Sequence, residues 1–303
     1  MKSLVYRAED VASGQAVAIK ILRREFPRFS DLVQFRNQFA IARLVAQPEV
    51  VRPYQLLPYR HGYALVMEHF GDTSLKQWLD HRQAHGQGAL PVADVLAIAR
   101  QLTDALDGLF QQHIIHKDIK PSNILIETAT GQVKLTDFSI ATRLPRETTT
   151  LPPGEMLEGT LTYISPEQTG RMNRGIDYRT DYYSLGVTLY ELLTGQPPFT
   201  APTPMALVYC HIAKQPPPLT EVNPAVPDAV AAIVRKLMAK NPEDRYQSIV
   251  GLQHDLDICR SQLTRTGAIA PFPLGQRDIS DRFLIPEKLY GREAEVAALL
   301  AAF

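Results

Sequence analysis

Cysteine is scarce in this sequence. Of its 303 residues only two are cysteines, Cys210 and Cys259, and both fall in segments with a helical pattern. Two such thiols do not supply the disulfide framework of a small secreted protein, whereas reduced structural thiols are common in cytosolic proteins. The cysteine content therefore predicts a cytosolic protein whose fold does not depend on disulfides.

An excess of charge of either sign is also lacking. The 32 lysines and arginines are balanced by 32 aspartates and glutamates, so the formal net charge is zero. Nucleic acids and anionic membrane surfaces attract proteins through a basic excess. We therefore predict neither nucleic acid nor membrane as a partner.

Long apolar runs are absent as well. No stretch approaches the roughly 20 apolar residues that a helix needs to cross a bilayer. The amino-terminal residues include Glu9 and Asp10, where a secretory signal peptide would have its apolar core. The sequence thus predicts a cytoplasmic protein.

What the sequence does contain is typical of a soluble globular protein, with 45% hydrophobic and 21% charged residues. The length allows one large two-lobed domain or two modest ones. Short β-branched runs separated by turn residues predict antiparallel strands over 3–8, 16–22, 52–58 and 62–68. Between them, Ser30-Asp31 predicts the cap of a helix, which carries one apolar stripe of Leu32, Phe35, Phe39 and Ala42.

Helical patterns dominate the rest of the chain. They cover residues 74–81, 92–112, 181–193, 206–213, 227–239 and 248–263. A strand-rich first quarter followed by helices predicts an α+β fold, in which a small antiparallel β-lobe sits on a large α-helical lobe with a cleft between them. After Thr266 the sequence predicts an extended, proline-containing linker, and a new helix begins near Arg292.

The most informative run is His116-Lys117-Asp118-Ile119-Lys120-Pro121-Ser122-Asn123-Ile124-Leu125. Its spacing is that of a phosphoryl-transfer loop, in which Asp meets the substrate hydroxyl, Lys meets the transferred phosphate and Asn holds a metal ion. Farther on, Asp137 follows the strand-like run Val133-Lys134-Leu135, and a hard cation prefers such carboxylate and amide oxygens. Each residue alone is common in turns and caps. The ordered set predicts phosphoryl transfer, with Asn123 and Asp137 as metal ligands.

This run resembles the protein kinases, and its Lys-Pro-Ser-Asn continuation is similar to the serine/threonine branch. The resemblance implies a bilobal kinase fold over residues 3 to about 263, with ATP and Mg²⁺ as cofactors. By the same resemblance Asp118 is the catalytic base or orients the hydroxyl, and Lys120 neutralises charge on the γ-phosphoryl group. The bridging magnesium ion is expected on Asp137 and Asn123.

The nucleotide side of the resemblance begins with Val17-Ala18-Ile19-Lys20, a kinase strand motif whose lysine contacts the α- and β-phosphates. Met67-Glu68-His69-Phe70 falls where the kinase hinge contacts adenine through its main chain. Val5, Ala18 and Leu125 match positions that enclose the adenine ring, although an ordinary core role for these apolar residues stays open. The implied nucleotide-binding set is Val5, Ala18, Lys20, Met67, Glu68, Phe70, Leu125 and Asp137.

A downstream segment, Gly159-Thr160 to Ser165-Pro166-Glu167, resembles the peptide-docking segment of the kinases. The resemblance implies that Thr160 hydrogen-bonds with Asp118 and Lys120. It further implies that Asp181 braces the catalytic loop and that Arg245 pairs with Glu167.

Four positions depart from the kinase pattern. The glycine-rich phosphate loop is missing, since Ser3 falls at its last glycine, which implies an N-terminally truncated β-lobe. Gln38 replaces the glutamate that pairs with Lys20, a loss of about 1–2 kcal/mol. Ser139 replaces a glycine and restricts the backbone. Lys117 replaces the arginine that grips a phosphate. Two interpretations of Thr148, Thr149 and Thr150 therefore stay open. They are either phosphorylation sites or ordinary polar residues of a loop.

The tail carries Tyr290-Gly291-Arg292-Glu293 and then an apolar-periodic segment, which resembles the entrance to an ATPase domain of the AAA/STAND type. Together with the kinase pattern it resembles the amino-terminal part of bacterial signalling proteins that join a serine/threonine kinase, an ATP-binding module and a sensor histidine kinase. A simple terminal helix is the alternative. The predicted division is a kinase domain over 1–265 (lobes 1–68 and 72–265), a linker over 266–289 and the start of a truncated ATPase domain over 290–303.

We therefore predict an ATP- and Mg²⁺-dependent serine/threonine protein kinase domain. Its expected partners are a protein substrate and, by the resemblance, downstream ATPase and sensor histidine kinase modules. A pseudokinase is the alternative, favoured by Gln38, Ser139 and the missing glycines. A small-molecule phosphotransferase is disfavoured, because such enzymes usually lack the peptide-docking segment. The working enzyme is favoured because the expected catalytic set is intact: Lys20, Asp118, Lys120, Asn123 and Asp137.

Overall fold

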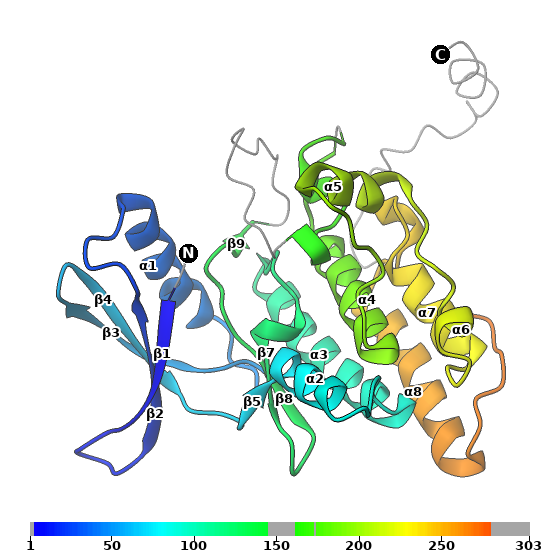
Figure 1. The fold of residues 1–303 in the computed structure, drawn as a ribbon, viewed down its shortest axis with the longest axis horizontal. Coiled ribbons are helices and arrows are strands. Elements are labelled where there is room, and N and C mark those ends of the chain that lie inside the picture. Colours follow the sequence, from blue (N-terminus) through cyan, green and yellow to red (C-terminus); the bar gives the residue numbers. More distant parts are fainter. Residues whose placement is uncertain (1–2, 145–160, 173, 280–303) are drawn as a thin grey trace.

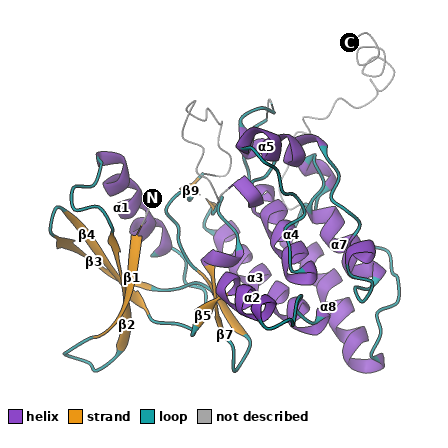
Figure 2. Ribbon diagram, in the orientation of Figure 1, coloured by secondary structure: helices purple, strands orange, loops and turns teal. Residues whose placement is uncertain are grey.

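The structure, a computed structural model, describes residues 3–144, 161–172 and 174–279. The four longest strands gather in an amino-terminal lobe, and most helices, with the shorter strands, form a second, larger lobe (Figures 1 and 2). This confirms the predicted α+β fold with a small antiparallel β-lobe and a large α-helical lobe. Within the described ranges, no helix is both long and apolar enough to cross a membrane.

The small lobe is built on a four-stranded antiparallel sheet in the order β1-β2-β4-β3. Val5 lies opposite Lys20, and Lys20 lies opposite Leu65. Because side chains alternate along a strand, these three cross-strand neighbours share one face of the sheet. The strands are β1 (Ser3–Glu9), β2 (Ala16–Leu22), β3 (Pro53–Tyr59) and β4 (Gly62–Glu68), as the sequence predicted within a residue or two.

Helix α1 (Phe29–Ala42) packs on this sheet through Phe35, which is fully buried against Leu65 and Met67. The prediction of Ser30-Asp31 as its cap was wrong, because the residue at the N-cap is Arg28. The Asp31 carboxylate accepts a hydrogen bond from the Arg28 backbone N–H at 3.2 Å, so it acts from inside the first turn.

A glycine allows the segment that connects the two lobes to pass close to the backbone of Ile126. After β4 the chain reaches Gly71, whose φ is +67° and whose added Cβ would lie 2.5 Å from the Ile126 carbonyl oxygen. Only glycine fits both the left-handed backbone and this contact. The next strand, β5 (Thr73–Ser74), pairs with β7 (Ile124–Glu127), and β7 pairs with β8 (Gln132–Leu135). The connection therefore lies beside the strand that carries Leu125.

The large lobe is organised around α4, which is buried along nearly its whole length and packs against α3 and α7. A helix buried on all sides belongs at the centre of a lobe. The sequence predicted the long helices but missed the short α6 and the short strands β5, β6 (Ile114–Ile115), β7 and β9 (Thr142–Arg143). The helices are α2 (Leu75–Ala84), α3 (Val92–Gln111), α4 (Arg179–Thr194), α5 (Pro204–Ala213), α6 (Leu219–Val222), α7 (Asp228–Leu237) and α8 (Ile249–Thr266).

Residues 267–279 follow α8 without a helix or strand and lie against the large lobe. Phe272 packs on the core, and Asp278 accepts hydrogen bonds from the backbone N–H groups of Gln247 and Ser248, both at 2.8 Å. The described part of the expected linker is therefore held on the lobe surface. The expected ATPase entrance at Tyr290–Glu293 lies outside the described residues.

Candidate active site

The catalytic run predicted from the sequence forms a compact loop between β6 and β7. Lys120 Nζ lies 2.8 and 2.7 Å from the two carboxylate oxygens of Asp118. Asn123 Nδ2 donates to Asp118 Oδ2 at 2.8 Å and to the Asp118 carbonyl at 2.9 Å. The loop thus brings Asp118, Lys120 and Asn123 into direct contact.

The backbone of this loop is held by a carboxylate of the central helix α4. Asp181 is buried, and its two oxygens accept hydrogen bonds from the N–H groups of His116 and Lys117, each at 2.8 Å. This is the bracing contact that the resemblance implied for Asp181. Lys117 has a φ of +66°, a conformation that costs energy in a non-glycine residue and that these contacts stabilise.

Asp137 lies just beyond β8 and next to the loop. The N–H of the preceding residue, Thr136, donates to the Asn123 carbonyl at 2.9 Å, which ties the Asp137 segment to the loop. Asp137 itself has a φ of +67°, and its Oδ1 lies 3.0 Å from Lys20 Nζ of β2. The five predicted catalytic residues therefore form two contacting groups, which are joined at Asn123.

The buried Lys20 has a second partner from α1. Its Nζ donates to Gln38 Oε1 at 3.0 Å, and both side chains are almost fully buried. Gln38 thus occupies the position expected of the replaced glutamate and keeps a hydrogen bond with Lys20. The ionic partner of this lysine is Asp137.

Replacing Gln38 with leucine is expected to lower the free energy of unfolding by about 1–3 kcal/mol, because a buried ammonium donor loses its acceptor. Urea unfolding measures the change. The matched control Gln38→Glu keeps an acceptor in place and should cost less than Gln38→Leu. Equal losses in the two variants would contradict the role of this hydrogen bond.

The donors at Asp137 and Asn123 suit a hard divalent cation. Burial favours a higher pKa for the Asp137 carboxyl, but the Lys20 ammonium and a hydrogen bond from Ser139 outweigh it and hold the pKa below its usual value. The side chain is therefore an anionic oxygen donor at neutral pH. Because both hydrogen bonds of the Asn123 amide nitrogen go to Asp118, the amide oxygen is left for a cation. These residues fit the metal site that the sequence predicted.

Ser139 contacts the site differently from what the sequence suggested. The described non-glycine residues with positive φ are Arg60, His113, Lys117 and Asp137, so the left-handed residue of the Asp-Phe-Ser run is Asp137. Ser139 therefore carries no backbone strain of this kind, and its side chain helps to lower the pKa of the Asp137 carboxyl.

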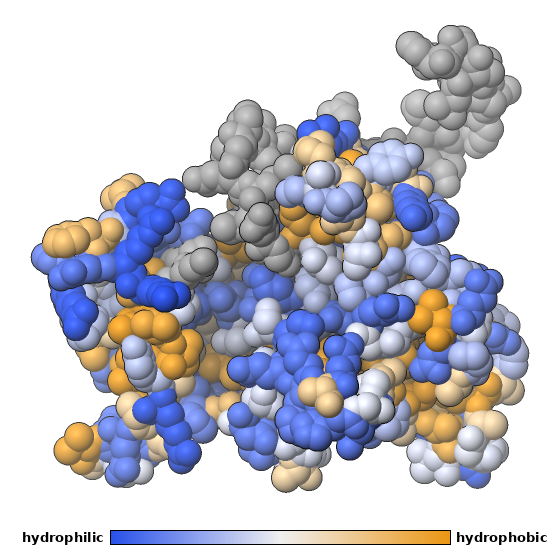
Figure 3. Space-filling view, in the orientation of Figure 1, coloured by the Kyte–Doolittle hydropathy of each residue, from blue (hydrophilic) through white to orange (hydrophobic). Residues whose placement is uncertain are grey.

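A cleft of about 650 Å³ opens between the lobes beside these groups. Figure 3 shows the surface hollowed where the two lobes meet. Asp118 and Lys120 do not line this cleft but adjoin it through Asn123. Its walls include every residue of the predicted nucleotide-binding set, together with Asn123: Val5, Ala18, Lys20, Met67, Glu68, Phe70, Leu125 and Asp137.

The backbone N–H and the carboxylate of the hinge residue Glu68 both bond to other residues of the chain. Its N–H donates to the Arg52 carbonyl at 2.8 Å, and its side chain accepts from the Arg52 N–H at 3.1 Å and pairs with Lys134. Glu68 also lines the cleft, so its main chain lies beside a ligand bound there.

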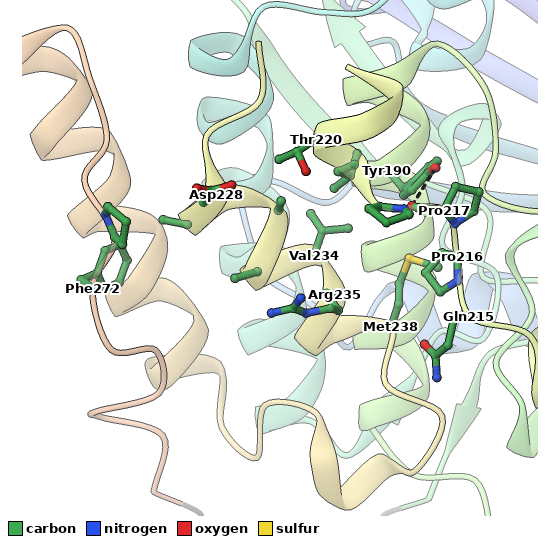
Figure 4. Close-up of a pocket in the computed structure, with 16 residues that line it drawn as sticks. Tyr190, Gln215, Pro216, Pro217, Thr220, Asp228, Val234, Arg235, Met238 and Phe272 are labelled. Atoms are coloured by element: carbon green, nitrogen blue, oxygen red, sulfur yellow. Dashed lines mark hydrogen bonds between the residues drawn. The ribbon is translucent and has the colours of Figure 1, made fainter. Parts of the chain in front are cut away.

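A second hollow, of about 660 Å³, lies on the large lobe away from these residues (Figure 4). Helix α7 contributes Arg235 and Val234, the 215–218 segment contributes prolines, and Phe272 stands on the opposite side. It contains none of the predicted site residues, which lie in or beside the inter-lobe cleft.

His116 is a fully buried member of the catalytic loop. Its Nε2 faces the Thr136 carbonyl at 3.2 Å and its Nδ1 accepts from the Asp118 N–H at 3.3 Å, which fixes the neutral tautomer with the proton on Nε2. Burial lowers the pKa of His116 from 6.5 to about 4.

The pH dependence of stability follows from this shift. Because the folded pKa is depressed, the contribution of neutral His116 is complete above pH 6.5 and is lost as the pH falls toward 4. The expected loss is about 3 kcal/mol. Urea unfolding between pH 4 and 7 measures it. His116→Asn should flatten the profile, whereas the same change at exposed His85 should not; identical profiles for wild type and His116→Asn would contradict the assignment.

Three other sequence expectations meet different outcomes. The carboxylate of Glu167 is paired with Arg245, as the resemblance implied, at 2.6 and 2.8 Å. Thr160 and the candidate phosphorylation sites Thr148, Thr149 and Thr150 lie outside the described residues.

Sequence reasoning missed Gln168, which reaches the catalytic loop from the segment after Glu167 and donates to the Lys117 carbonyl at 2.9 Å. A glutamine in a turn carries no pattern that would have revealed it.

Several known proteins are similar to this chain in sequence. The chain matches the protein kinase domain family over residues 2–256. It is 34% identical over 264 residues to serine/threonine-protein kinase PknB of Mycobacterium leprae (strain TN), a match that covers 84% of this chain and 40% of that protein. It is also 34% identical over 255 residues to serine/threonine-protein kinase PrkC of Bacillus subtilis (strain 168), covering 83% of this chain and 38% of that protein.

A third relative, serine/threonine-protein kinase Pkn1 of Myxococcus xanthus, is 32% identical over 275 residues, which are 89% of this chain and 38% of that protein. The chain thus spans about two fifths of the length of these curated relatives. The family match covers most of the chain and includes both lobes and the cleft between them. The chain belongs to the protein kinase family.

Proposed function

We propose that this chain is an ATP- and Mg²⁺-dependent serine/threonine protein kinase domain, which transfers the γ-phosphoryl group of ATP to a Ser or Thr hydroxyl of a protein substrate. The observation that carries the proposal is the convergence of Asp118, Lys120 and Asn123 with the Lys20–Asp137 pair at one edge of the inter-lobe cleft. The serine/threonine kinases at 32–34% identity support the choice of acceptor.

Asp118 would orient the acceptor hydroxyl and take its proton as the oxygen attacks. Burial raises the pKa of the Asp118 carboxyl against the opposing effect of Lys120, which makes this carboxylate a better proton acceptor than an exposed one. Lys120 lies close enough to both Asp118 oxygens to hold that carboxylate in place. Its ammonium would also offset the negative charge on the transferred group.

The cleft residues would bind and orient the nucleotide. Val5, Ala18 and Leu125 line the cleft and offer apolar contacts for the adenine ring. The main-chain carbonyl of Glu68 would accept a hydrogen bond from the exocyclic amine of adenine. Lys20 is the buried cation on the same wall and would contact the α- and β-phosphates.

Asn123 and Asp137 are the residues that would hold Mg²⁺. In the described part of the chain no group of three or more His, Cys, Asp or Glu side chains is arranged to hold a metal ion. That suits Mg²⁺, which commonly takes one or two carboxylates together with phosphate oxygens and water. When bound, the ion would supply positive charge to the β- and γ-phosphates.

The pseudokinase alternative loses two of its supports in this geometry. Gln38 keeps a hydrogen bond to Lys20, and the backbone of Ser139 is not strained by a positive φ. Neither substitution separates the groups on which phosphoryl transfer depends. The working enzyme is the better account of the site.

Labelled ATP tests the proposal. The purified chain is incubated with γ-labelled ATP, Mg²⁺ and a generic acceptor protein, and the labelled amino acids are identified after hydrolysis. We expect label on serine or threonine, with transfer removed by EDTA and in the Asp137→Asn variant. Transfer that is equal in the wild type and in Asp137→Asn would contradict the proposal.

We further propose that the kinase domain covers 1–265 and that the chain beyond it connects to ATPase and sensor histidine kinase modules, in a cytoplasmic signalling protein. The support is the sequence pattern at Tyr290–Glu293. Co-purification of the chain with separately expressed modules of that kind would test the partnership.

A further inference from the structure

Gln168 makes a contact that links the segment after Glu167 to the catalytic loop. Its side chain is almost fully buried, and its Nε2 donates to the Lys117 carbonyl at 2.9 Å. Its Oε1 accepts from both the N–H and the hydroxyl of Ser165, each at 3.1 Å. Only one orientation of the amide satisfies this set, because the backbone N–H must meet oxygen and the carbonyl must meet nitrogen.

The carbonyl that Gln168 holds belongs to the peptide unit that leads directly into Asp118. The other end of that unit, the Asp118 N–H, donates to His116 Nδ1 at 3.3 Å. The peptide plane is therefore fixed at both ends, by Gln168 at the oxygen and by His116 at the nitrogen. Its orientation sets the direction in which the Asp118 side chain leaves the backbone.

This control matters because the Asp181 contacts act on the peptide units before the Lys117 carbonyl. Asp181 accepts hydrogen bonds from the N–H groups of His116 and Lys117 and so holds the φ of Lys117 at +66°. The next peptide turns about the ψ bond of Lys117 and the φ bond of Asp118, and its hydrogen bonds with Gln168 and His116 hold it. A buried carbonyl without its donor carries a desolvation cost, so loss of the Gln168 donor favours rotation of this peptide.

Gln168 is itself rigidly held. Its partner Ser165 is fully buried, and the Ser165 hydroxyl lies 3.4 Å from the hydroxyl of Thr180. The Thr180 hydroxyl donates to the Glu167 carboxylate at 2.7 Å, and Glu167 pairs with Arg245. A chain of buried polar contacts therefore runs from that ion pair to the backbone of the catalytic loop.

We propose that Gln168 is a positioning residue for phosphoryl transfer, which orients the Asp118 carboxylate through the Lys117–Asp118 peptide. The proposal rests on the proposed kinase function. It assigns Gln168 no contact with the nucleotide, because Gln168 does not line the inter-lobe cleft. Loss of the hydrogen bond from Gln168 Nε2 to the Lys117 carbonyl should thus slow the chemical step and leave ATP binding intact.

The test compares Gln168→Met with the matched control Gln101→Met in the whole chain. Gln101 is another glutamine that bridges backbone groups. It donates to the Gly131 carbonyl at 3.0 Å and accepts from the Val133 N–H at 3.0 Å, at the start of β8. Both substitutions remove the same kind of hydrogen bonds. Only Gln168→Met removes one from the catalytic loop.

We expect kcat to fall by about 10- to 100-fold in Gln168→Met, as for a small displacement of a reacting group, with KM for ATP within about twofold of wild type. Gln101→Met should retain wild-type kcat at equal folded fraction. If Gln168→Met fails to fold, Gln168→Glu, measured at pH 8, keeps both bonds from Ser165 and removes the donor when ionised. A kcat within twofold of wild type in the Gln168 variant, or a loss equal to that of Gln101→Met, would overturn the proposal.

Hydrogen exchange separates this proposal from the kinase assignment. We expect the amides of residues 114–119 to exchange about tenfold faster in Gln168→Met than in wild type or Gln101→Met. Unchanged exchange there would overturn the positioning role. If the wild type transfers no phosphate at all, the proposed function fails, and the exchange rates still decide whether Gln168 holds the loop.

Discussion

Replacing Asp118 with asparagine is expected to reduce phosphoryl transfer by about 10²- to 10⁴-fold, which is the usual contribution of a positioned base. Asparagine keeps the size and one oxygen of the side chain but removes its charge and its basicity. The ion pair with Lys120, at 2.7–2.8 Å, is lost at the same time. Initial rates with labelled ATP and a generic acceptor protein measure the effect.

The affinity for ATP should change little in this variant, because Asp118 does not line the nucleotide cleft. Calorimetric titration with a non-hydrolysable ATP analogue and Mg²⁺ supplies that control. A variant that keeps a tenth or more of the wild-type rate would remove Asp118 from the mechanism. A variant that no longer binds the analogue would show that the substitution damages the cleft and not the chemistry alone.

Replacing Arg245 with methionine is expected to lower the free energy of unfolding by about 3–5 kcal/mol, the largest stability effect that we predict. The Arg245 and Glu167 side chains are 0% and 1% exposed, and the two guanidinium nitrogens lie 2.6 and 2.8 Å from the two carboxylate oxygens. Methionine fills much of the same volume but leaves the Glu167 charge buried without its cation. Urea unfolding at pH 7 measures the loss.

The double variant Arg245→Met with Glu167→Gln is the control. Since it buries no unpaired charge at Glu167, it should recover part of the stability that Arg245→Met loses. Burial opposes the effect of Arg245, yet the ion pair wins and holds the pKa of Glu167 below its usual value. The stability from this pair is therefore present above the ordinary pKa of a glutamate and is lost as the pH falls below it. A single variant as stable as wild type would contradict the account.

The sequence was most informative where chemistry requires a fixed order of residue types. The run from His116 to Leu125 and Asp137 predicted a set of side chains that do meet in the fold. The strand pattern around Lys20 predicted a strand over 16–22, which the structure contains as β2. Alternation along strands and the 3.6-residue period of helices carry this information locally, so both lobes could be predicted.

The sequence was less informative where a side chain acts across the fold. The N-cap of α1 was assigned to the wrong residues because Asp31 accepts its hydrogen bond from the Arg28 N–H while lying inside the first turn. The sequence rule expects the acceptor side chain at the residue before the helix. Gln168 was missed because its role depends on a tertiary contact with Lys117. The conformation of Asp137 was missed for a similar reason. A positive φ in a non-glycine residue is stabilised by surrounding contacts, here the ion pair with Lys20.

A crystal structure of the chain with a non-hydrolysable ATP analogue and Mn²⁺ tests the central claim most directly, because the anomalous signal of manganese locates the metal independently of the nucleotide. The account predicts Mn²⁺ bound by the side-chain oxygens of Asn123 and Asp137, the adenine ring between Ala18 and Leu125, and the terminal phosphate facing Asp118. A nucleotide bound outside the inter-lobe cleft, or a metal ion that contacts neither Asn123 nor Asp137, would contradict it.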